Sequence, residues 1–594
     1  MRCLLIFFIL QTWVQGQVYN SPWHFKCVNG RCNKYEITPE VRSPKSLEVC
    51  QLLCGDAGGL WPRPTGPYSL STSIEIMNPE IIRLRLANST SKGGRLLLRK
   101  VKNLMLNFQK LGVKSTTFNK VGLNITITGL KNYNDTALTL NTNESYTLNI
   151  QQKNSSSIPV TIRGETYFGV RNALETLSQL IAFNHLTKEY QMLTNVSITD
   201  APVYPYRGIL LDTSRNYIDK KTILKILEAM GMSKLNTFHW HITDSPSFAY
   251  ESRTWPNMSR YGAYSPEKVY TAEDVKEIVE AGIYHGVRVI PELDAPAHVG
   301  EGWQWVGNDS VVCFRAEPYY RYCAGPPCGN LNPTSEKVYE VLQGLYKDML
   351  EDFKPDIFHM GGDEVRLGCW QSSESIKRWM RQKNWSTSTA DYMKLWSHFQ
   401  TRAYEQLQIA NGGKDIKAVL WTSTLTDQNY LRHLDPQKYI IQIWTDVKDK
   451  TIKRLLDNNF QVIFSNYDAL YLDCGFGAWI GAGNGWCSPY KTWQKIYDNS
   501  PLRIARSQGV TSKEHLILGG EAALWTEIAG SSSVDNRLWP RSAAMAERLW
   551  AEPGSNWKAA EQRLILHRER LVKRGILADT TEPEWCQQNQ GHCN

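Results

Sequence analysis

The sequence predicts an α/β protein in which a (β/α)8 TIM barrel is preceded by a smaller α+β domain. Two patterns lead to this prediction. From Tyr206 onward, short apolar runs that end in polar residues alternate with segments that keep apolar residues at helical spacing. Before Tyr206 the chain is more polar and carries alternating apolar stretches, as in strands with one solvated face. A length of 594 residues also suits two or more domains.

Eight apolar runs are the candidates for the barrel strands. They span residues 208–212, 237–241, 287–291, 357–360, 418–421, 440–444, 461–464 and 516–520. Between them, residues 221–230, 271–284 and 336–353 follow helical spacing, and Thr271 with Asp274 suits a helix start. An open doubly wound sheet is the competing architecture. No glycine-rich phosphate loop follows the first run, which favours the barrel.

The region before the barrel shows both strand and helix patterns. Residues 81–86 and 123–127 are predicted strands, and residues 169–183 are a predicted helix. A Pro-Tyr cluster at residues 202–205 marks the boundary. We therefore expect an N-terminal α+β domain at residues 17–204 and a barrel domain with a C-terminal tail at residues 205–594.

Residues 1–16 are a predicted signal peptide. Arg2 precedes an apolar run at residues 4–10, and Val14 and Gly16 are the small residues expected before a cleavage site. The run is shorter than the roughly 20 apolar residues that span a bilayer, and no later segment is apolar enough. We expect a secreted protein or one in the lumen of the secretory pathway, extracellular or lysosomal/vesicular, without a membrane span.

The cysteines fit an oxidising compartment. The twelve that follow the predicted signal peptide are Cys27, Cys32, Cys50, Cys54, Cys313, Cys369, Cys323, Cys328, Cys474, Cys487, Cys586 and Cys593, and an even number suits a disulfide framework. A zinc site could be built from the first four, but C-x4-C and C-x3-C spacings in a secreted chain favour disulfides.

Glycosylation sequons also indicate passage through the secretory pathway. The candidates are Asn88, Asn124, Asn134, Asn143, Asn154, Asn195, Asn257, Asn308 and Asn384. The formal net charge of +9 is spread along the chain without runs of Lys or Arg, so it suggests no nucleic-acid partner.

The residues that follow the eight runs are rich in carboxylates and tryptophan. In chain order they include Asp212, Arg215, His241, Asp244, Glu292, Asp294, His298, Asp363, Glu364, Trp421, Trp444, Tyr471, Asp473, Trp525 and Glu527. Barrel active sites form at this end of the strands. Aromatic faces pack against sugar rings, while carboxylates and Arg bind hydroxyls. Any one tryptophan could be core and any one acid a helix cap, but their common position favours a sugar pocket.

The most specific local feature is the sequence of residues 359–364, His-Met-Gly-Gly-Asp-Glu. Two glycines let the backbone turn tightly and present the adjacent carboxyls of Asp363 and Glu364. Neighbouring carboxyls repel when both are charged, which favours a protonated acid beside an ionised one. Glycoside cleavage uses that division of labour. A helix-start cap and a metal-ligand pair are the alternatives for this string alone.

Residues 211–215, 238–244, 291–298 and 359–364 together resemble the family 20 β-N-acetylhexosaminidases, and within that family the insect chitooligosaccharide-degrading β-N-acetylglucosaminidases. The resemblance spans nearly the whole mature chain. It implies that the N-terminal α+β domain is non-catalytic. It also implies a homodimer, and an enzyme that needs no cofactor and no metal.

The resemblance implies a role for each catalytic residue. Glu364 is the general acid that protonates the glycosidic oxygen. The substrate's own acetamido oxygen is the nucleophile, and Asp363 orients the acetamido group, so the attack is intramolecular. Tyr471 binds the acetamido oxygen, while His298 and Asp244 hold and tune Glu364. Water activated by Glu364 then gives the retained β-anomer.

Substrate-binding residues follow from the same resemblance. Arg215, Asp473 and Glu527 bind sugar hydroxyls, Trp421, Trp444 and Trp525 wall the pocket, and Trp486 is the platform for the next sugar. The chain departs from the family pattern at Ala324 and Gly325, where chitin-degrading members often carry Val-Glu. Spacing and likeness together suggest the pairs Cys323–Cys328, Cys474–Cys487 and Cys586–Cys593.

We therefore expect an exo-acting, retaining glycoside hydrolase that releases terminal β-linked N-acetylglucosamine, with N-acetylgalactosamine as an alternative, from chitooligosaccharides. An N-glycan-trimming hexosaminidase is the alternative among enzymes. An inactive carbohydrate-binding homologue is the alternative from another class, although a lectin needs no acid such as Glu364.

Overall fold

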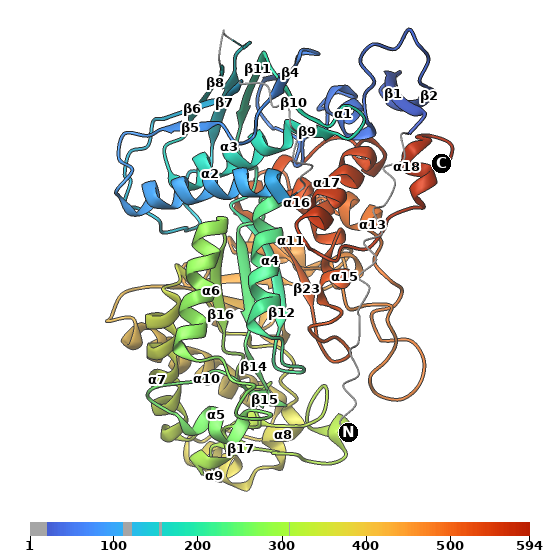
Figure 1. Ribbon diagram of the computed structural model, residues 1–594. Coiled ribbons are helices and arrows are strands. Elements are labelled where there is room, and N and C mark those ends of the chain that lie inside the picture. The colour runs from blue at the N-terminus through green and yellow to red at the C-terminus, as the bar shows by residue number, and fades with distance from the viewer. Residues whose placement is uncertain (1–20, 111–120, 154–156, 308, 594) are drawn as a thin grey trace, which may run out of the picture.

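The computed structural model describes residues 21–110, 121–153, 157–307 and 309–593. The predicted signal peptide and the sequons at Asn154 and Asn308 lie outside these ranges. Figure 1 shows the N-terminal sheets, in blue and teal, above a barrel, with the C-terminal helices in red beside both.

The predicted barrel is confirmed, because eight parallel strands close on themselves. In order around the barrel they are β12 (Tyr206–Asp212), β13 (Thr237–His241), β16 (Arg288–Glu292), β19 (Ile357–His359), β20 (Lys417–Trp421), β21 (Tyr439–Ile443), β22 (Gln461–Phe464) and β23 (Ile517–Leu524). Each predicted run overlaps one of these strands. The barrel interior is packed at its N-terminal end by a separate apolar cluster that includes Tyr206, Ile290 and Ile440.

Helices surround the barrel. They include α4 (Lys220–Met232), α6 (Ala272–His285), α7 (Glu336–Phe353), α10 (Thr389–Ala410), α11 (Thr451–Asp457), α13 (Trp493–Asp498), α14 (Pro501–Ser507) and α16 (Arg541–Ala551). The start of α6 is as predicted, since Thr271 and Asp274 form a reciprocal capping box. Gly286 ends this helix at a φ of 75°.

Short elements fill the connections of the barrel. They are β14 (Thr243–Asp244), β15 (Ser247–Phe248), α5 (Asn257–Gly262), β17 (Val311–Val312), β18 (Asn330–Leu331), α8 (Leu367–Ser372), α9 (Glu374–Gln382), α12 (Tyr467–Leu470) and α15 (Val534–Leu538). Most lie after the carboxyl end of a strand, where they shape the candidate site.

The N-terminal region has two sheets. One has the order β3 (Tyr68–Ser69), β11 (Val196–Asp200), β7 (Tyr146–Ile150), β8 (Ser157–Arg163), β6 (Gly122–Thr128) and β5 (Ile82–Arg85); the other has the order β4 (Ile74–Met77), β10 (Glu189–Leu193) and β9 (Ile181–Asn184). The helices α2 (Lys92–Lys110) and α3 (Tyr167–Gln179) lie between the first sheet and the barrel (Figure 1). The predicted strands at 81–86 and 123–127 correspond to β5 and β6.

The predicted helix at 169–183 is wrong at its end. Helix α3 stops at Gln179, and Leu180 leaves the helical conformation as its C-cap. The next residues form β9, in which Phe183 pairs with Tyr190 of β10. A short apolar run continues from helix to strand here, and apolar periodicity alone does not show where the change occurs.

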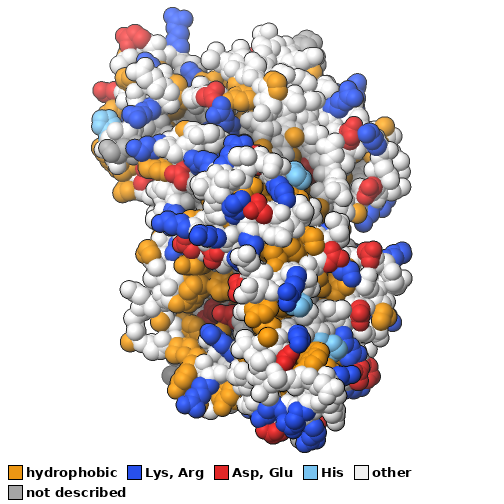
Figure 2. All heavy atoms as spheres, turned by 180° about the vertical axis from the view of Figure 1, so that it is seen from behind, with side chains coloured by type: hydrophobic (Ala, Val, Ile, Leu, Met, Phe, Trp, Pro, Cys, Tyr) orange, Lys and Arg blue, Asp and Glu red, His pale blue; other side chains and the backbone are white. Residues whose placement is uncertain are grey.

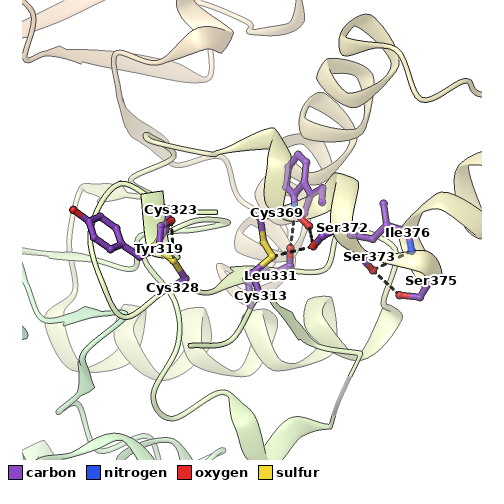
Figure 3. The surroundings of a disulfide bond; sticks show 11 residues. Cys313, Tyr319, Cys323, Cys328, Leu331, Cys369, Ser372, Ser373, Ser375 and Ile376 are labelled. Atoms are coloured by element: carbon purple, nitrogen blue, oxygen red, sulfur yellow. Dashed lines mark hydrogen bonds between the residues drawn. A yellow bond between two sulfur atoms is a disulfide. The ribbon is translucent and has the colours of Figure 1, made fainter. Parts of the chain in front are cut away.

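All twelve predicted cysteines are paired, and the three suggested local pairs are present. Cys27–Cys54 and Cys32–Cys50 fasten the hairpin of β1 (Trp23–Val28) and β2 (Arg31–Glu36) to α1 (Leu47–Leu53). Cys313–Cys369 joins the long segment after β16 to α8, close to Cys323–Cys328 (Figure 3). The twelve cysteines are therefore not available as zinc ligands.

The C-terminal tail reaches back to the N-terminal region. It contains α17 (Glu561–Lys573) and α18 (Glu584–Gln588), and the side chain of Gln590 accepts a hydrogen bond from the backbone of Cys32. Buried ion pairs also tie the two regions together, with Glu144 2.7 Å from Arg207 and Asp200 3.1 Å from Lys234.

Five sequon asparagines, Asn88, Asn134, Asn143, Asn195 and Asn384, are exposed, while Asn124 and Asn257 are partly buried. In the ranges that the structure describes, no helix combines the length and apolar character needed to cross a membrane.

Candidate active site

The loop after β19 has a backbone that its glycines make possible. Gly361 and Gly362 have φ values of 62° and 86°. A Cβ atom on Gly361 would lie 1.8 Å from Oδ1 of Asp294, so only glycine fits there. The amide of Gly362 donates to the same oxygen at 2.8 Å. This close approach sets Asp363 and Glu364 at the carboxyl end of the strand, as the sequence predicts.

His298 and Asp244, the two residues predicted to support Glu364, form a chain of contacts with it. Nε2 of His298 lies 3.3 Å from Oε2 of Glu364, and Nδ1 lies 3.1 Å from Oδ2 of Asp244. Arg215 also reaches Oδ2 of Asp244, at 2.7 Å. The arrangement is a continuous chain from the guanidinium to the carboxyl that faces the pocket.

The charges along this series of contacts favour the ionised forms of His298 and Glu364. Burial favours the neutral ring of His298, but Asp244 and Asp294 outweigh it and raise the pKa of His298 well above its usual value. Burial raises the pKa of Glu364, but the hydrogen bond and charge of His298 outweigh burial and lower it. In the free enzyme Glu364 is therefore paired with a charged imidazole. A proton can pass between them without either leaving hydrogen-bond reach.

Asp363 has a different environment from Glu364. Burial raises its pKa to about 6, and the charges of Glu364 and Glu292 add to this. Burial and the Asp363 charge together raise the pKa of Asp294 well above its usual value. Among the described residues, Oδ1 of Asp363 has no hydrogen-bond partner. Asp363 thus presents a carboxyl oxygen that has no hydrogen bond and lies 4.0 Å from Nε2 of His298.

An aromatic wall covers one side of these carboxyls. Trp525 lies 6.0 Å from Trp421 and 6.1 Å from Tyr471 between ring centroids, and the Arg215 guanidinium lies 5.0 Å from the Trp525 ring. Trp444 donates its indole N–H to the backbone oxygen of Thr422 at 2.7 Å, which fixes its ring. The four aromatic residues predicted from the strand ends therefore belong to one cluster.

Trp486 occupies the outer edge of this cluster. Its side chain is 67% exposed, and its ring lies 5.2 Å from Tyr467, 6.1 Å from Tyr471 and 6.3 Å from Trp444. Trp421, in contrast, is buried and donates its indole N–H to Glu292 at 2.8 Å. The wall therefore runs from a buried indole inside to an exposed one at the rim.

Asp473 and Glu527 lie on the side of the site where β22 and β23 end. Burial raises the pKa of Asp473 to about 7, and the charge of Glu527 adds to this. Burial likewise raises the pKa of Glu527. Oδ1 of Asp473 has no partner among the residues that the structure describes. A partly buried carboxyl with an unused acceptor atom, as in Asp473, is suited to a sugar hydroxyl.

Tyr471 is held as a neutral phenol. Burial raises its pKa well above the usual value, and the neighbouring charges of Asp363 and Asp473 reinforce the effect. A neutral phenol is a hydrogen-bond donor, which is what an acetamido oxygen requires. Figure 2 shows a hollow in the barrel half of the molecule with acidic side chains on its floor and hydrophobic ones on its rim. A cavity of about 660 Å³ lies elsewhere, between the N-terminal region and helices α4 and α6.

Sequence reasoning gave no role to a buried cluster beneath the site. His239, His241 and His359 converge on the carboxylate of Glu292, with imidazole nitrogens 2.6–3.0 Å from its oxygens. The signal was present, because alternate residues of a barrel strand share a face and both His239 and His241 lie on β13. These groups have the donors of a metal site, and within the cluster His241 is hydrogen-bonded to Glu292 through Nδ1 at 2.6 Å.

Trp479 was also missed. A Cβ atom on Gly325 would lie 3.2 Å from its indole ring, so the loop closed by Cys323–Cys328 packs directly on Trp479. The side chain is 47% exposed. The departure from Val-Glu at Ala324 and Gly325 is therefore accompanied by an indole that approaches the same loop.

The fold and the site together define a glycoside hydrolase: a TIM barrel whose strand ends present a histidine-supported acid, a second carboxyl and an aromatic wall. Residues 204–553 match the model of the glycosyl hydrolase family 20 catalytic domain, and residues 60–180 match one described as beta-acetyl hexosaminidase like. The chain belongs to glycosyl hydrolase family 20. The resemblance identified from the sequence motifs is thus confirmed.

Two insect relatives match along nearly their whole length, and a human relative matches along about three quarters of its length. The chain is 46% identical over 594 residues to the chitooligosaccharidolytic beta-N-acetylglucosaminidase of Ostrinia furnacalis, covering 99% of this chain and 98% of that one. The Bombyx mori protein of the same name is 47% identical over 579 residues, covering 97% of this chain and 96% of that one. The human beta-hexosaminidase subunit beta is 33% identical over 453 residues, covering 75% of this chain and 74% of that one.

A solved structure supports the fold. The family 20 exo beta-N-acetylglucosaminidase of Vibrio harveyi, solved in complex with N-acetylglucosamine, superposes with a TM-score of 0.69 at 21% identity, covering 94% of this chain and 84% of that one.

Proposed function

We propose that this enzyme is an exo-acting β-N-acetylglucosaminidase that releases terminal non-reducing N-acetylglucosamine from chitooligosaccharides. The observation that carries the proposal is the contact chain Asp244–His298–Glu364 beside Oδ1 of Asp363, which has no hydrogen-bond partner among the described residues. The names of the two insect relatives support the substrate. An inactive carbohydrate-binding homologue would have no use for an acid supported in this way.

Glu364 takes the proton of the His298 imidazolium and delivers it to the glycosidic oxygen as the bond to the anomeric carbon breaks. The substrate's acetamido oxygen attacks that carbon, and Asp363 receives the acetamido N–H as positive charge develops there. Tyr471 donates its phenol to the acetamido oxygen and turns it toward the carbon. Glu364, now ionised, takes a proton from the water that opens the intermediate, and the β-configuration is retained.

The remaining site residues hold the sugar. Arg215, Asp473 and Glu527 bind hydroxyls of the terminal residue, and Asp473 and Glu527 keep protons easily because burial raises both pKa values. Trp421, Trp444 and Trp525 enclose the ring and the acetamido methyl group. Donors and acceptors grouped around one sugar suit an exo mode of action, in which the pocket takes the non-reducing terminal sugar and the rest of the substrate extends outward past Trp486.

The next sugar of the substrate would stack on Trp486 at the rim, which favours β-linked oligomers with flat faces. Trp479 lies against the Cys323–Cys328 loop and supplies apolar surface where a branched side chain is absent. On this ground we propose that the substrates are chitooligosaccharides rather than branched N-glycans. N-acetylgalactosamine is the alternative terminal sugar.

The biological setting is inferred from the same observations. Six disulfides indicate folding in an oxidising compartment, and we propose secretion or retention in the secretory lumen. We also propose a homodimer, a non-catalytic α+β domain at residues 17–204, a catalytic domain at residues 205–594, and catalysis without a metal or other cofactor.

The substrate is tested by comparing chitobiose with a branched N-glycan that ends in N-acetylglucosamine. We expect kcat/KM to be higher for chitobiose by about tenfold, the effect of roughly 1.4 kcal/mol of added stacking in the transition state. A higher value for the branched glycan would favour the N-glycan-trimming alternative. Release of internal fragments from a long chitooligomer would contradict the exo mode.

A further inference from the structure

The supporting chain of Glu364 continues past Asp244 into the barrel interior. Nε2 of His241 lies 3.0 Å from Oδ2 of Asp244, and Nδ1 lies 2.6 Å from Oε2 of Glu292. One step deeper, His239 lies 2.9 Å from Glu292 through Nε2 and 2.9 Å from Glu521 through Nδ1. Carboxylates and imidazoles therefore alternate from the barrel interior to the catalytic acid.

The fold builds this alternation from strand geometry. Side chains two residues apart on a strand share a face, so β13 directs both His239 and His241 into the barrel. The register between β13 and β16 sets His241 opposite Glu292. Both His241 and Glu292 are fully buried, so water screens their contact little.

His241 is charged at neutral pH. Burial favours its neutral ring, but Glu292 and Asp244 outweigh burial and raise the pKa of His241 to about 10. The carboxyl of Asp294 also faces His241. On its other side the ring contacts Trp525 edge-on at 5.0 Å.

Asp244 depends on several donors at once. Oδ2 lies within 2.7 Å of Arg215, 3.0 Å of His241 and 3.1 Å of His298. Removing His241 would leave this oxygen with one donor fewer and would free the carboxylate to turn toward Arg215. A buried carboxylate that loses a charged donor is strongly penalised.

We propose that His241 is a positioning residue for the catalytic acid: it links Asp244 to Glu292 and so fixes the carboxylate that aligns His298 with Glu364. The inference rests on the proposed function, because it takes Glu364 as the acid. His241 does not touch the substrate and acts through Asp244 and His298.

The test is the pH dependence of kcat and KM in His241→Gln, measured with a chromogenic N-acetylglucosaminide. We expect kcat to fall about tenfold, a fraction of the 10² to 10⁴ that a positioned acid contributes, while KM stays within about twofold. The alkaline limb of kcat/KM should move up by roughly one pH unit, because loss of a buried positive charge favours protonated Glu364.

His567→Gln is the matched control. His567 is buried and hydrogen-bonded to Ser233 at 2.9 Å, but burial lowers its pKa to about 3, so the substitution removes a neutral ring outside the site. It should change Tm without moving kcat or the alkaline limb. A shift of Tm alone in His241→Gln, as in this control, would reduce His241 to a structural residue and overturn the inference.

Glu292→Gln is the second variant, and it tests the positioning role of His241 if His241→Gln does not fold. It keeps the shape of the side chain and an acceptor for Trp421, but removes the charge that holds the proton on His241. We expect the same fall in kcat at unchanged KM, and wild-type kcat in a folded Glu292→Gln would overturn the inference. Wild type and Glu364→Gln are assayed alongside: if both hydrolyse equally well, the proposed function fails rather than this inference.

Discussion

His298 lies between Asp244 and Glu364, with one ring nitrogen 3.1 Å from the first carboxylate and the other 3.3 Å from the second. A buried imidazole that faces two carboxylates holds a proton and a fixed orientation at once. The Glu364 carboxyl, the acid of the proposed mechanism, is therefore held in place by His298 in the free protein.

Asp244→Asn should lower kcat about 100-fold while the fold is kept. The amide occupies the same volume, but it offers a weaker acceptor to His298 and Arg215 and no longer holds the imidazolium proton. Steady-state kinetics on a chromogenic N-acetylglucosaminide measures the effect. Asp352→Asn, which alters an ion pair with Arg253 away from the site, should leave kcat unchanged. A comparable loss in both variants would argue against a specific role for Asp244.

Asp363→Asn should make the protein more stable and less active. Because burial raises the folded-state pKa of Asp363 from 3.8 to about 6, its stabilising contribution is complete only below pH 4 and is lost as the pH rises through 6. The neutral amide removes this penalty, on the order of 2–3 kcal/mol at pH 7.

Thermal unfolding at pH 7 and pH 4 checks the sign for Asp363→Asn. We expect a higher Tm than wild type at pH 7 and little difference at pH 4. The same ionisation predicts that kcat/KM of wild type falls as the pH drops through about 6, because protonated Asp363 cannot receive the acetamido N–H. If Asp363→Asn and wild type have the same Tm at pH 7 as well as at pH 4, ionisation of Asp363 does not destabilise the folded protein.

Trp486→Ala should raise KM for chitotriose about fivefold to tenfold and leave that for a chromogenic monosaccharide nearly unchanged. The ring is exposed at the rim and stacks only on sugars beyond the terminal one. Trp585→Ala removes another exposed indole, near the C-terminus, and should change neither value. If Trp486→Ala weakens both substrates equally, the indole belongs to the terminal-sugar pocket instead.

Gly361→Ala should destabilise the enzyme by more than about 2 kcal/mol and abolish turnover. The new methyl group would overlap Oδ1 of Asp294, and the residue would also adopt an unfavourable φ of 62°. Gly412→Ala isolates the backbone contribution, because φ is 68° there and no atom lies within 4 Å of the added Cβ. Denaturant unfolding of the two variants should therefore differ by the cost of the overlap. An equal loss of unfolding free energy in the two variants would show that the loop after β19 moves to accommodate the added methyl group.

The barrel was predictable because each parallel strand is buried on both faces and so reads as a continuous apolar run. The site followed from the polar residue after each run, since carboxyl ends of parallel strands meet at one rim. Assignment of individual roles to Glu364, Asp363 and Tyr471 needed the family resemblance, because many side chains at that rim have suitable chemistry.

Other features could not be predicted for identifiable reasons. The end of α3 is set by pairing of β9 with β10, a tertiary contact that the apolar pattern of residues 169–183 does not record. The convergence of His239, His241 and His359 on Glu292 depends on the register of three strands. Trp479 approaches Gly325 through the folding of two loops, which neither segment reveals alone.

The most direct measurement is turnover of a chromogenic β-N-acetylglucosaminide by Glu364→Gln beside wild type at the same pH. The substituted amide would keep the shape and one hydrogen bond of the acid but could not deliver a proton, so kcat should fall by at least the 10² to 10⁴ of general acid catalysis. Binding of N-acetylglucosamine itself, measured by calorimetry, should persist. Turnover near the wild-type rate would contradict the assignment of Glu364 as the acid, and with it the proposed mechanism.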